Sequence, residues 1–333
     1  MGRVDFILVP LPAAMITMLK ATLSSSSLSS ARRPAASSTS ASLATVWRSL
    51  IIGVLLVASL LLTGCSAVRL AYNQAPTLAY WWLDAYVGFD ETQSPKVKEA
   101  VAEWFAWHRA AQLPELAVLL VRAQAQASEA VTPEQVCGWN DELTKQVSDG
   151  FAQALPALAQ VALTLTPAQL QRMERKYADG HQEYAKEYLQ ANVDERRKLV
   201  VNRTVERAER LYGRLEPAQR ERIAQGVAAS PFDPHLWLAE RKARQQDILR
   251  ALRQIQMPGV TAEQARAELR GVGDRLRQSP RAEYVAYQRK LVPHNCQMAA
   301  DIHNAASPAQ RASAVGRLKG WEGDVRALAS QAR

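Results

Sequence analysis

The chain has 333 residues, of which 48% are hydrophobic and 22% charged, with 41 basic against 32 acidic side chains and a formal net charge of +9. Residues 1–64 hold five of the basic side chains and one acidic one, so the remainder carries only +5. This remainder is long enough for one large helical domain or two small ones, and its mild charge is unlike the one-sided field of a nucleic-acid-binding protein. We therefore expect no nucleic-acid partner.

The first 46 residues are rich in serine and alanine. They include the run Ser24–Ser27 and a second such tract over 35–44, and they carry few charges. Such a composition cannot bury a hydrophobic core. We expect residues 1–46 to be disordered, or to be an extension upstream of the true start of translation.

A short hydrophobic segment follows. An apolar run covers 50–62, with Arg48 just upstream. As a helix this run would be about 20 Å long, which is shorter than the roughly 30 Å core of a bilayer. A basic residue, a short apolar core and small residues before a cleavage point are the parts of a secretory signal. The sequence therefore predicts a signal peptide over 47–64, cleaved between Gly64 and Cys65.

The residues at that cleavage point, Leu62-Thr63-Gly64-Cys65, resemble the lipobox of bacterial lipoproteins. The resemblance implies that the Cys65 thiol receives a diacylglyceryl group and that the amine freed by cleavage is then acylated. Two or more acyl chains give stable membrane attachment. In Gram-negative lipoproteins a residue other than aspartate after the cysteine, here Ser66, goes with transfer to the outer membrane. We therefore expect a lipid-anchored protein at the periplasmic face of the cell outer membrane.

Two further cysteines, Cys137 and Cys296, follow the signal. Export would place them in an oxidising compartment, where paired cysteines form disulfides. Two buried free thiols are the alternative. We expect residues 65–76 to form a lipidated tether, and residues 77–333 to form an all-helical periplasmic domain that contains this cysteine pair.

The fold class that the sequence predicts is all-α, as a multi-helix bundle or stacked helical hairpins. Helix-forming residues dominate beyond residue 76, and no alternating β-branched run of strand length occurs. Several helix starts repeat one capping signal, a hydroxyl at the N-cap and glutamine three residues later. The hydroxyls belong to Thr132, Thr166, Thr261 and Ser307, and Glu216 begins a weaker version.

The predicted helices cover 77–88, 95–112, 114–129, 132–154, 166–190, 194–214, 217–229, 235–256, 262–278, 281–304 and 308–331. Breaks are expected at Pro114, Pro156, Gly213, Pro231/Pro234, Pro258-Gly259 and Ser279-Pro280.

An aromatic stretch begins directly after the expected tether. Tyr80, Trp81, Trp82 and Tyr86 are candidates for contact with the membrane or a partner, because such side chains have an apolar body and a polar tip. The alternative is an ordinary core face, which the helical spacing of Trp82, Tyr86 and Phe89 also fits.

An arginine stripe forms the second candidate site. At 100° per residue five arginines of the helix predicted over 194–214 share one face, which is separate from the apolar face and from the acidic face of the same helix. They are Arg196, Arg203, Arg207, Arg210 and Arg214. Guanidinium groups bind phosphate and carboxylate in a bidentate way, so the stripe is a candidate anion-binding surface. The alternative is a solvated face, or arginines paired with acidic residues of a neighbouring helix.

Catalytic motifs are missing from the sequence. It contains no zinc-protease, nucleophile-elbow or phosphate-loop motif, and we expect a protein that is not an enzyme and needs no cofactor. His294, Asp301 and His303 lie close to Cys296, but their spacing matches no standard zinc pattern, so we expect no metal. His108 shares an apolar helical face, which favours a hydrogen-bonded core histidine.

The chain is similar to a known family in several short segments. They are Leu70-Ala71-Tyr72-Asn73, Trp81-Trp82-Leu83-Asp84, Trp104 with Trp107-His108, and the Thr-Pro-x-Gln helix starts. The chain resembles lipoproteins of Gram-negative bacteria that are catalogued as a domain of unknown function. The resemblance implies an all-helical periplasmic lipoprotein and supplies no activity or catalytic residues.

These observations favour an envelope scaffold or binding module. We expect it to be attached to the membrane through its N-terminal lipid, with an envelope protein, an anionic lipid or peptidoglycan as partner. The alternative is a periplasmic chaperone-like protein that binds unfolded clients. Leu165-Thr166-Pro167-Ala168-Gln169 is similar to a motif of small periplasmic chaperones, although helix capping also explains it.

Overall fold

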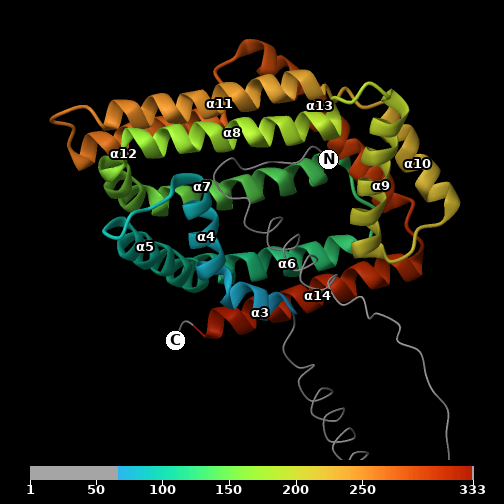
Figure 1. The fold of residues 1–333 in the computed structure, drawn as a ribbon. Coiled ribbons are helices and arrows are strands. Elements are labelled where there is room, and N and C mark those ends of the chain that lie inside the picture. Colours follow the sequence, from blue (N-terminus) through green and yellow to red (C-terminus); the bar gives the residue numbers. More distant parts are fainter. Residues whose placement is uncertain (1–66, 332–333) are drawn as a thin grey trace, which may run out of the picture.

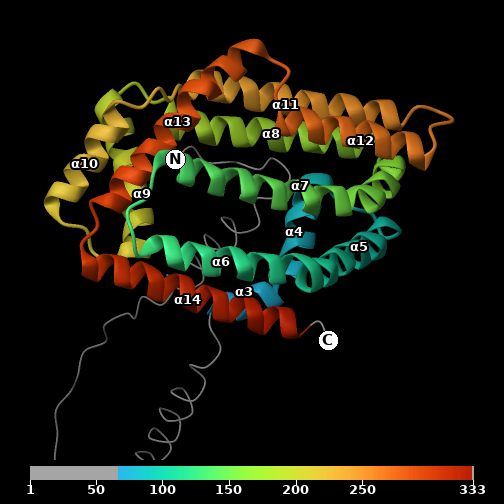
Figure 2. The same cartoon turned by 180° about the vertical axis from the view of Figure 1, so that it is seen from behind.

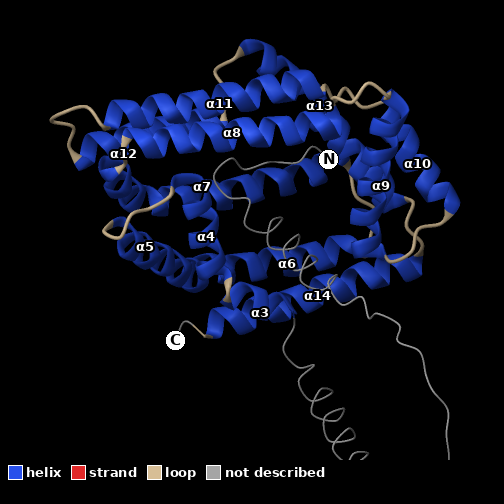
Figure 3. Cartoon of the chain, viewed as in Figure 1, coloured by secondary structure: helices blue, strands red, loops and turns tan. Residues whose placement is uncertain are grey.

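The computed structural model describes residues 67–331, and every regular element within that range is helical (Figure 3). The prediction of an all-α fold is confirmed. In chain order the helices are α3 (Ala67–Asn73), α4 (Ala75–Val87), α5 (Gln93–Trp107), the π-helical turn η2 (His108–Gln112), α6 (Leu113–Ala127), α7 (Pro133–Thr164), α8 (Pro167–Tyr188), α9 (Val193–Tyr212), α10 (Pro217–Ala228), α11 (Pro234–Ile255), α12 (Ala262–Arg277), α13 (Ala282–Asn304) and α14 (Pro308–Ser330).

The capping signals place the helix starts where the sequence predicts them. The hydroxyl oxygens of Thr132, Thr166, Thr261 and Ser307 each accept from the backbone N–H three residues later, and the side-chain oxygen of each glutamine accepts from the cap's own backbone N–H. These reciprocal bonds satisfy donors that a helix end leaves open. In the weaker version, the Glu216 N–H donates to Gln219 Oε1 over 2.8 Å.

Two expected helix breaks are wrong. Helix α7 continues through Pro156, because the flanking residues Leu155 and Ala159 are buried in the main core and their burial offsets the lost backbone hydrogen bond. Pro114 does not end a helix either. The turn η2 precedes it, with the Leu113 N–H donating to the His108 carbonyl five residues back, so the chain stays helical from α5 into α6.

Most of the segment expected as a tether, residues 65–76, is helical. Its residues from Ala67 onward are helical, in α3 and the start of α4, and α3 packs against α14. Arg69 Nε lies 3.2 Å from Asp324 Oδ1 of α14. Residues 67–76 therefore belong to the folded body and not to a linker.

The helices form layers that Figures 1 and 2 show from opposite sides. Helices α8 and α11 run along one edge and α6 and α14 along the other, while α7 passes between them. Helices α4 and α5 close one end, and α9 and α10 close the other. Of the described helices, none has both the length and the apolar character to cross a bilayer.

The largest hydrophobic core lies where α7, α8, α11 and α12 meet. It includes Leu155, Ile255 and Ala265, each at most 3% exposed. Gly273 of α12 permits close packing there, because a Cβ at this position would collide with the ring of Phe151. This contact explains a glycine that no sequence motif explains.

Two glutamine pairs join helix starts that are distant in sequence. Gln169 Nε2 of α8 donates to Gln93 Oε1 of α5 (2.6 Å) and to the carbonyl of Gly88 (2.9 Å), which ends α4 with a positive φ of 71°. Gln93 Nε2 in turn donates to the Thr164 carbonyl over 2.8 Å.

The second pair has the same design. Gln310 Nε2 of α14 donates to Gln219 Oε1 of α10 (3.0 Å) and to the Arg214 carbonyl (2.9 Å), next to Gly213, which ends α9 with a φ of 80°. Gln219 Nε2 donates to the Ala305 carbonyl over 2.8 Å. Helix α8 packs on α11, and α14 packs on α6.

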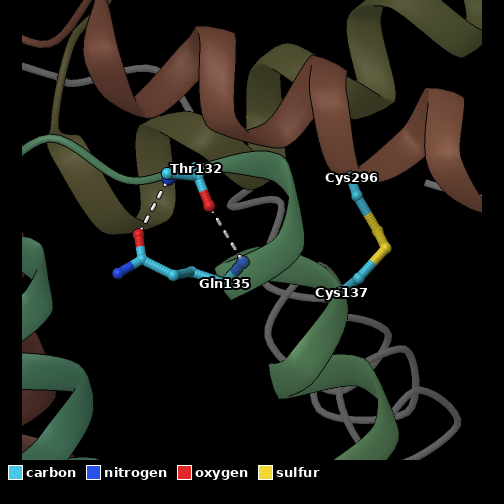
Figure 4. Close-up of a disulfide and its surroundings, with 4 residues drawn as sticks. All are labelled: Thr132, Gln135, Cys137 and Cys296. Carbon is cyan, nitrogen blue, oxygen red and sulfur yellow. Dashed lines mark hydrogen bonds between the residues drawn. A yellow bond between two sulfur atoms is a disulfide. The ribbon is translucent and has the colours of Figure 1, made fainter.

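A disulfide joins Cys137 to Cys296, as the sequence predicts (Figure 4). Their Cα atoms are 5.5 Å apart and the residues are separated by 159 positions. The bond lies one turn beyond the capping box of Thr132 and Gln135, so the first turns of α7 are held both by their cap and by a covalent link to α13.

Candidate anion-binding pocket

A pocket of about 230 Å³ lies at the junction of five helices. Its lining includes the ends of α8 and α10, α9 between Val193 and Arg207, the first turn of α11 and the middle of α13. This junction is at the end of the molecule that α9 and α10 close (Figure 1).

Side-chain caps place the two helices that begin at the pocket. Asn192 accepts from the backbone N–H groups of Asp194 and Glu195 and starts α9. Asp233 accepts from two N–H groups in the same way and starts α11. Arg196 Nη1 donates to the Gln190 carbonyl over 2.6 Å, which fixes the turn between α8 and α9.

Four aromatic rings form one wall of the pocket. The Tyr184 ring stacks between those of Tyr188 and Trp237, with centroid distances of 4.7 and 4.5 Å. Phe232 meets Tyr188 edge-on at 6.4 Å and also packs against Tyr284, Tyr287 and Leu291. The wall therefore joins α8 to α11 and α13.

Four arginines, Arg196, Arg197, Arg203 and Arg207, give the pocket its charge, and none of its described lining residues is acidic. Arg203 lies over the Tyr188 ring and forms an ion pair with Glu187, which is not among the lining residues. A concave site with guanidinium groups and no carboxylate favours an anionic ligand.

The predicted arginine stripe is divided by the structure. Arg196, Arg203 and Arg207 line the pocket, while Arg210 is exposed on the same helix outside it, and Arg214 is exposed in the loop that follows, because α9 ends at Tyr212 and not at residue 214. The apolar face of α9 is buried through residues such as Val205, Ala208 and Tyr212, against α10 and α14. The alternative of arginines paired with a neighbouring helix applies to Arg203 and its partner on α8.

The aromatic candidates of α4 have different environments. Tyr86 packs on Tyr177 at 6.0 Å and belongs to the edge of the main core, with Trp82 against it at 4.8 Å. Tyr80 donates to Ser94 Oγ over 3.0 Å. Trp81 is 60% exposed, so it is the member of this set that remains available for an external contact. The cleavage and lipidation residues Gly64 and Cys65 lie outside the described residues.

The histidines that the sequence singles out have hydrogen-bond partners within the fold. His294 Nε2 lies 2.9 Å from the Gly226 carbonyl, and His303 lies between the Tyr212 hydroxyl and the Glu129 carbonyl. Over residues 67–331 no cluster of three metal-ligating side chains occurs.

His108 lies within an aromatic cluster at the start of η2. Its Nδ1 is 2.7 Å from the Tyr72 hydroxyl and its ring stacks on Trp104 at 5.0 Å. Burial lowers the pKa of His108 to about 4. Because the folded state holds this group neutral, the unfolded state binds more protons between the pKa values of about 6.5 and 4.

We therefore expect His108 to make the protein acid-sensitive. The contribution of His108 to the free energy of unfolding should be constant above about pH 6.5 and fall through the window to pH 4 by up to about 3 kcal/mol. His108→Gln should flatten this dependence, whereas His235→Gln, at an exposed position, should leave it unchanged. Urea unfolding followed by circular dichroism at a series of pH values measures this slope, and an unchanged slope in His108→Gln would contradict the assignment.

The aromatic wall is the part of the pocket that the sequence does not indicate. Tyr184 and Tyr188 are four residues apart on one helix, which is the only local signal, while Phe232 and Trp237 come from a loop and a later helix. The arginine periodicity reveals a charged face, but not that aromatic rings lie opposite it.

Comparison with known proteins gives one match. Residues 85–265 match the model of a family of unknown function, DUF6279, and this stretch includes α5 to α11 with all pocket residues except those of α13. No curated protein and no solved structure matches the chain. Because the match covers more than half of its residues, the chain belongs to the DUF6279 family of unknown function.

Proposed function

We propose that the protein is a lipoprotein of the Gram-negative envelope whose helical body is a binding module for an anionic component of that envelope. Lipid on Cys65 would hold it at the periplasmic face of the outer membrane. The lipobox-like residues 62–65 support this location. The Cys137–Cys296 disulfide also supports it, because such bonds persist in oxidising compartments.

The surface next to the anchor suits a membrane. Helix α3 begins two residues after Cys65, and Val68 and Leu70 on it are 46% and 64% exposed. Trp81 on the following helix is 60% exposed. Apolar and tryptophan side chains this close to an acyl anchor would lie at the lipid interface.

The observation that carries the binding role is the pocket with four arginines and no acidic residue in its described lining. Phosphates of lipids and carboxylates of peptidoglycan are the abundant fixed anions of the proposed compartment. Arginine recognises both groups through paired, charge-assisted hydrogen bonds.

Lipid attachment is tested on the intact protein in Gram-negative cells. We expect labelled palmitate to enter the wild-type protein, and the protein to fractionate with the outer membrane. Cys65→Ser should abolish the label and release the protein from that fraction, because no acyl chain would then hold it. Retention of Cys65→Ser in the membrane fraction would overturn the proposed anchor.

The binding role is tested in the same cells with a photocrosslinking residue at Val193, which lines the pocket and is 51% exposed. Leu143 on α7 is the matched control, since it is equally apolar and 50% exposed. We expect adducts from Val193 and none from Leu143. Equal adducts from both positions would show that contact at the pocket is not specific.

A further inference from the structure

We propose that the pocket binds an acyl chain that ends in a single anionic group, a carboxylate or a phosphate. The inference rests on the proposed binding role and names its ligand class. The acyl chain would enter the pocket between α8, α10 and α13, and its anionic head would lie at the arginines of α9.

The interior of the pocket suits a flexible aliphatic group. Val200, Val227, Leu291 and Met298 contribute apolar side chains from three helices. The methionine can adapt to chains of different shape, because its side chain is unbranched and polarizable. An apolar cavity of about 150 Å³ holds a benzene-sized molecule, so a pocket of about 230 Å³ has room for a short alkyl chain.

The aromatic wall argues against a planar ligand stacked between rings. Tyr184 has a ring on each side, with interplanar angles of 22° to Tyr188 and 21° to Trp237. A flat ligand would have to separate this stack and lose its ring–ring contacts. An alkyl chain can instead lie along the edge of the wall without disturbing it.

The anionic head follows from the position of the arginines. Arg197 and Arg207 are exposed and line the pocket from α9, ten positions apart, and Arg197 also forms an ion pair with Asp194 over 3.3 Å. Arg196 closes the turn before them through the Gln190 carbonyl. A carboxylate or phosphate between these side chains would receive charge-assisted hydrogen bonds, whereas an ammonium head would be repelled.

The test uses the full-length chain with Cys65→Ser, so that its own lipid does not compete, and titrates hexanoate, octanoate and decanoate by calorimetry. Each added methylene should tighten binding about fourfold until the pocket is filled, after which affinity should level off. Octyl phosphate should bind like the carboxylates, and octylammonium should not bind. Binding to vesicles that contain anionic lipid is measured as well. This comparison distinguishes an acyl chain that belongs to a membrane lipid from the acyl chain of a free fatty carboxylate.

Matched variants locate the site. Arg197→Gln/Arg207→Gln should weaken octanoate binding roughly tenfold or more by removing two charged donors, and Ala228→Phe, which fills the pocket from α10, should remove the dependence on chain length. Arg210→Gln/Arg214→Gln carries the same charge change outside the pocket, at the end of α9 and just after it, and should bind as before. Circular dichroism spectra that match the parent protein would show that each variant is folded.

Several results would overturn the inference. Affinity that does not depend on chain length would indicate an anion site without an acyl pocket. Equal binding of octylammonium, or equal losses in the two arginine pairs, would indicate unspecific association. Failure of the palmitate experiment together with normal octanoate binding would remove the envelope location and leave the acyl pocket standing, so the two proposals fail separately.

Discussion

Replacing Cys137 with serine is expected to lower the free energy of unfolding of the oxidised protein by up to about 5 kcal/mol. The disulfide to Cys296 spans 159 positions, and the entropy that such a link removes from the unfolded chain grows with the length of the loop. Typical domains are stable by only about 5–15 kcal/mol. The loss should therefore be a large fraction of the total, and urea unfolding followed by circular dichroism measures it.

The redox state supplies the control for this experiment. Under reducing conditions the wild-type protein and Cys137→Ser should unfold at nearly the same urea concentration, because neither then contains the link. Cys137→Ala/Cys296→Ala tests whether a free thiol at the buried position 296 adds an effect of its own. On non-reducing gels the oxidised wild type should migrate faster than Cys137→Ser. Identical migration and identical unfolding without reductant would mean that the bond is not formed.

Helix starts could be predicted because their chemistry is local. Thr166 and Gln169 complete a capping box within three residues, and the same pattern marks the starts of α7, α12 and α14. The second role of the glutamine is not local. Gln169 also binds Gln93 and the Gly88 carbonyl, which lie about 80 positions earlier in the chain.

The wrong helix breaks have a related cause. The helix propensity of proline is low wherever it occurs, so the sequence alone predicts an interruption at Pro156. Tertiary packing decides otherwise, because Leu155 and Ala159 on either side of it are buried against other helices. At Pro114 the deciding feature is the wide turn η2, for which the sequence offers no reliable signal.

The candidate pocket was partly accessible to sequence reasoning. The period of 3.6 residues places Arg196, Arg203 and Arg207 on one face of α9 without any knowledge of the fold. The aromatic wall opposite them could not be inferred, because Tyr184 and Trp237 come together only when α8 packs on α11. Charge periodicity thus predicts a surface, while packing between distant helices makes it a pocket.

Replacing Arg281 with alanine is expected to cost about 3 kcal/mol of stability. Arg281 precedes α13 and contacts two buried carboxylates of α11. Its guanidinium forms ion pairs with Glu240, over 3.3 Å, and with Asp247. These carboxylates are only 3% and 9% exposed. Without the arginine they retain Arg244 and Arg250 of their own helix but lose the group that bridges them.

The same network supports the pocket, because it fixes the start of α13 against α11. Arg244 of the network lies over the Tyr284 ring, which packs with Phe232 of the aromatic wall. Arg281→Ala should therefore weaken octanoate binding as well as stability, without removing any residue that lines the pocket. Arg281→Lys should recover part of the stability only, because an ammonium group cannot contact both carboxylates with a planar fork.

Neutralising Glu240 and Asp247 tests whether Arg281→Ala destabilises the protein through buried charge or through lost packing. In Arg281→Met/Glu240→Gln/Asp247→Asn no buried carboxylate remains, and the amide oxygens at 240 and 247 can still accept hydrogen bonds from Arg244 and Arg250, which lose their ion pairs. We expect this triple variant to be more stable than Arg281→Ala. A double-mutant cycle between positions 281 and 247 should give a coupling energy of roughly 1 kcal/mol or more. A coupling energy near zero in that cycle would show that the ion pair between Arg281 and Asp247 does not explain the effect of Arg281→Ala.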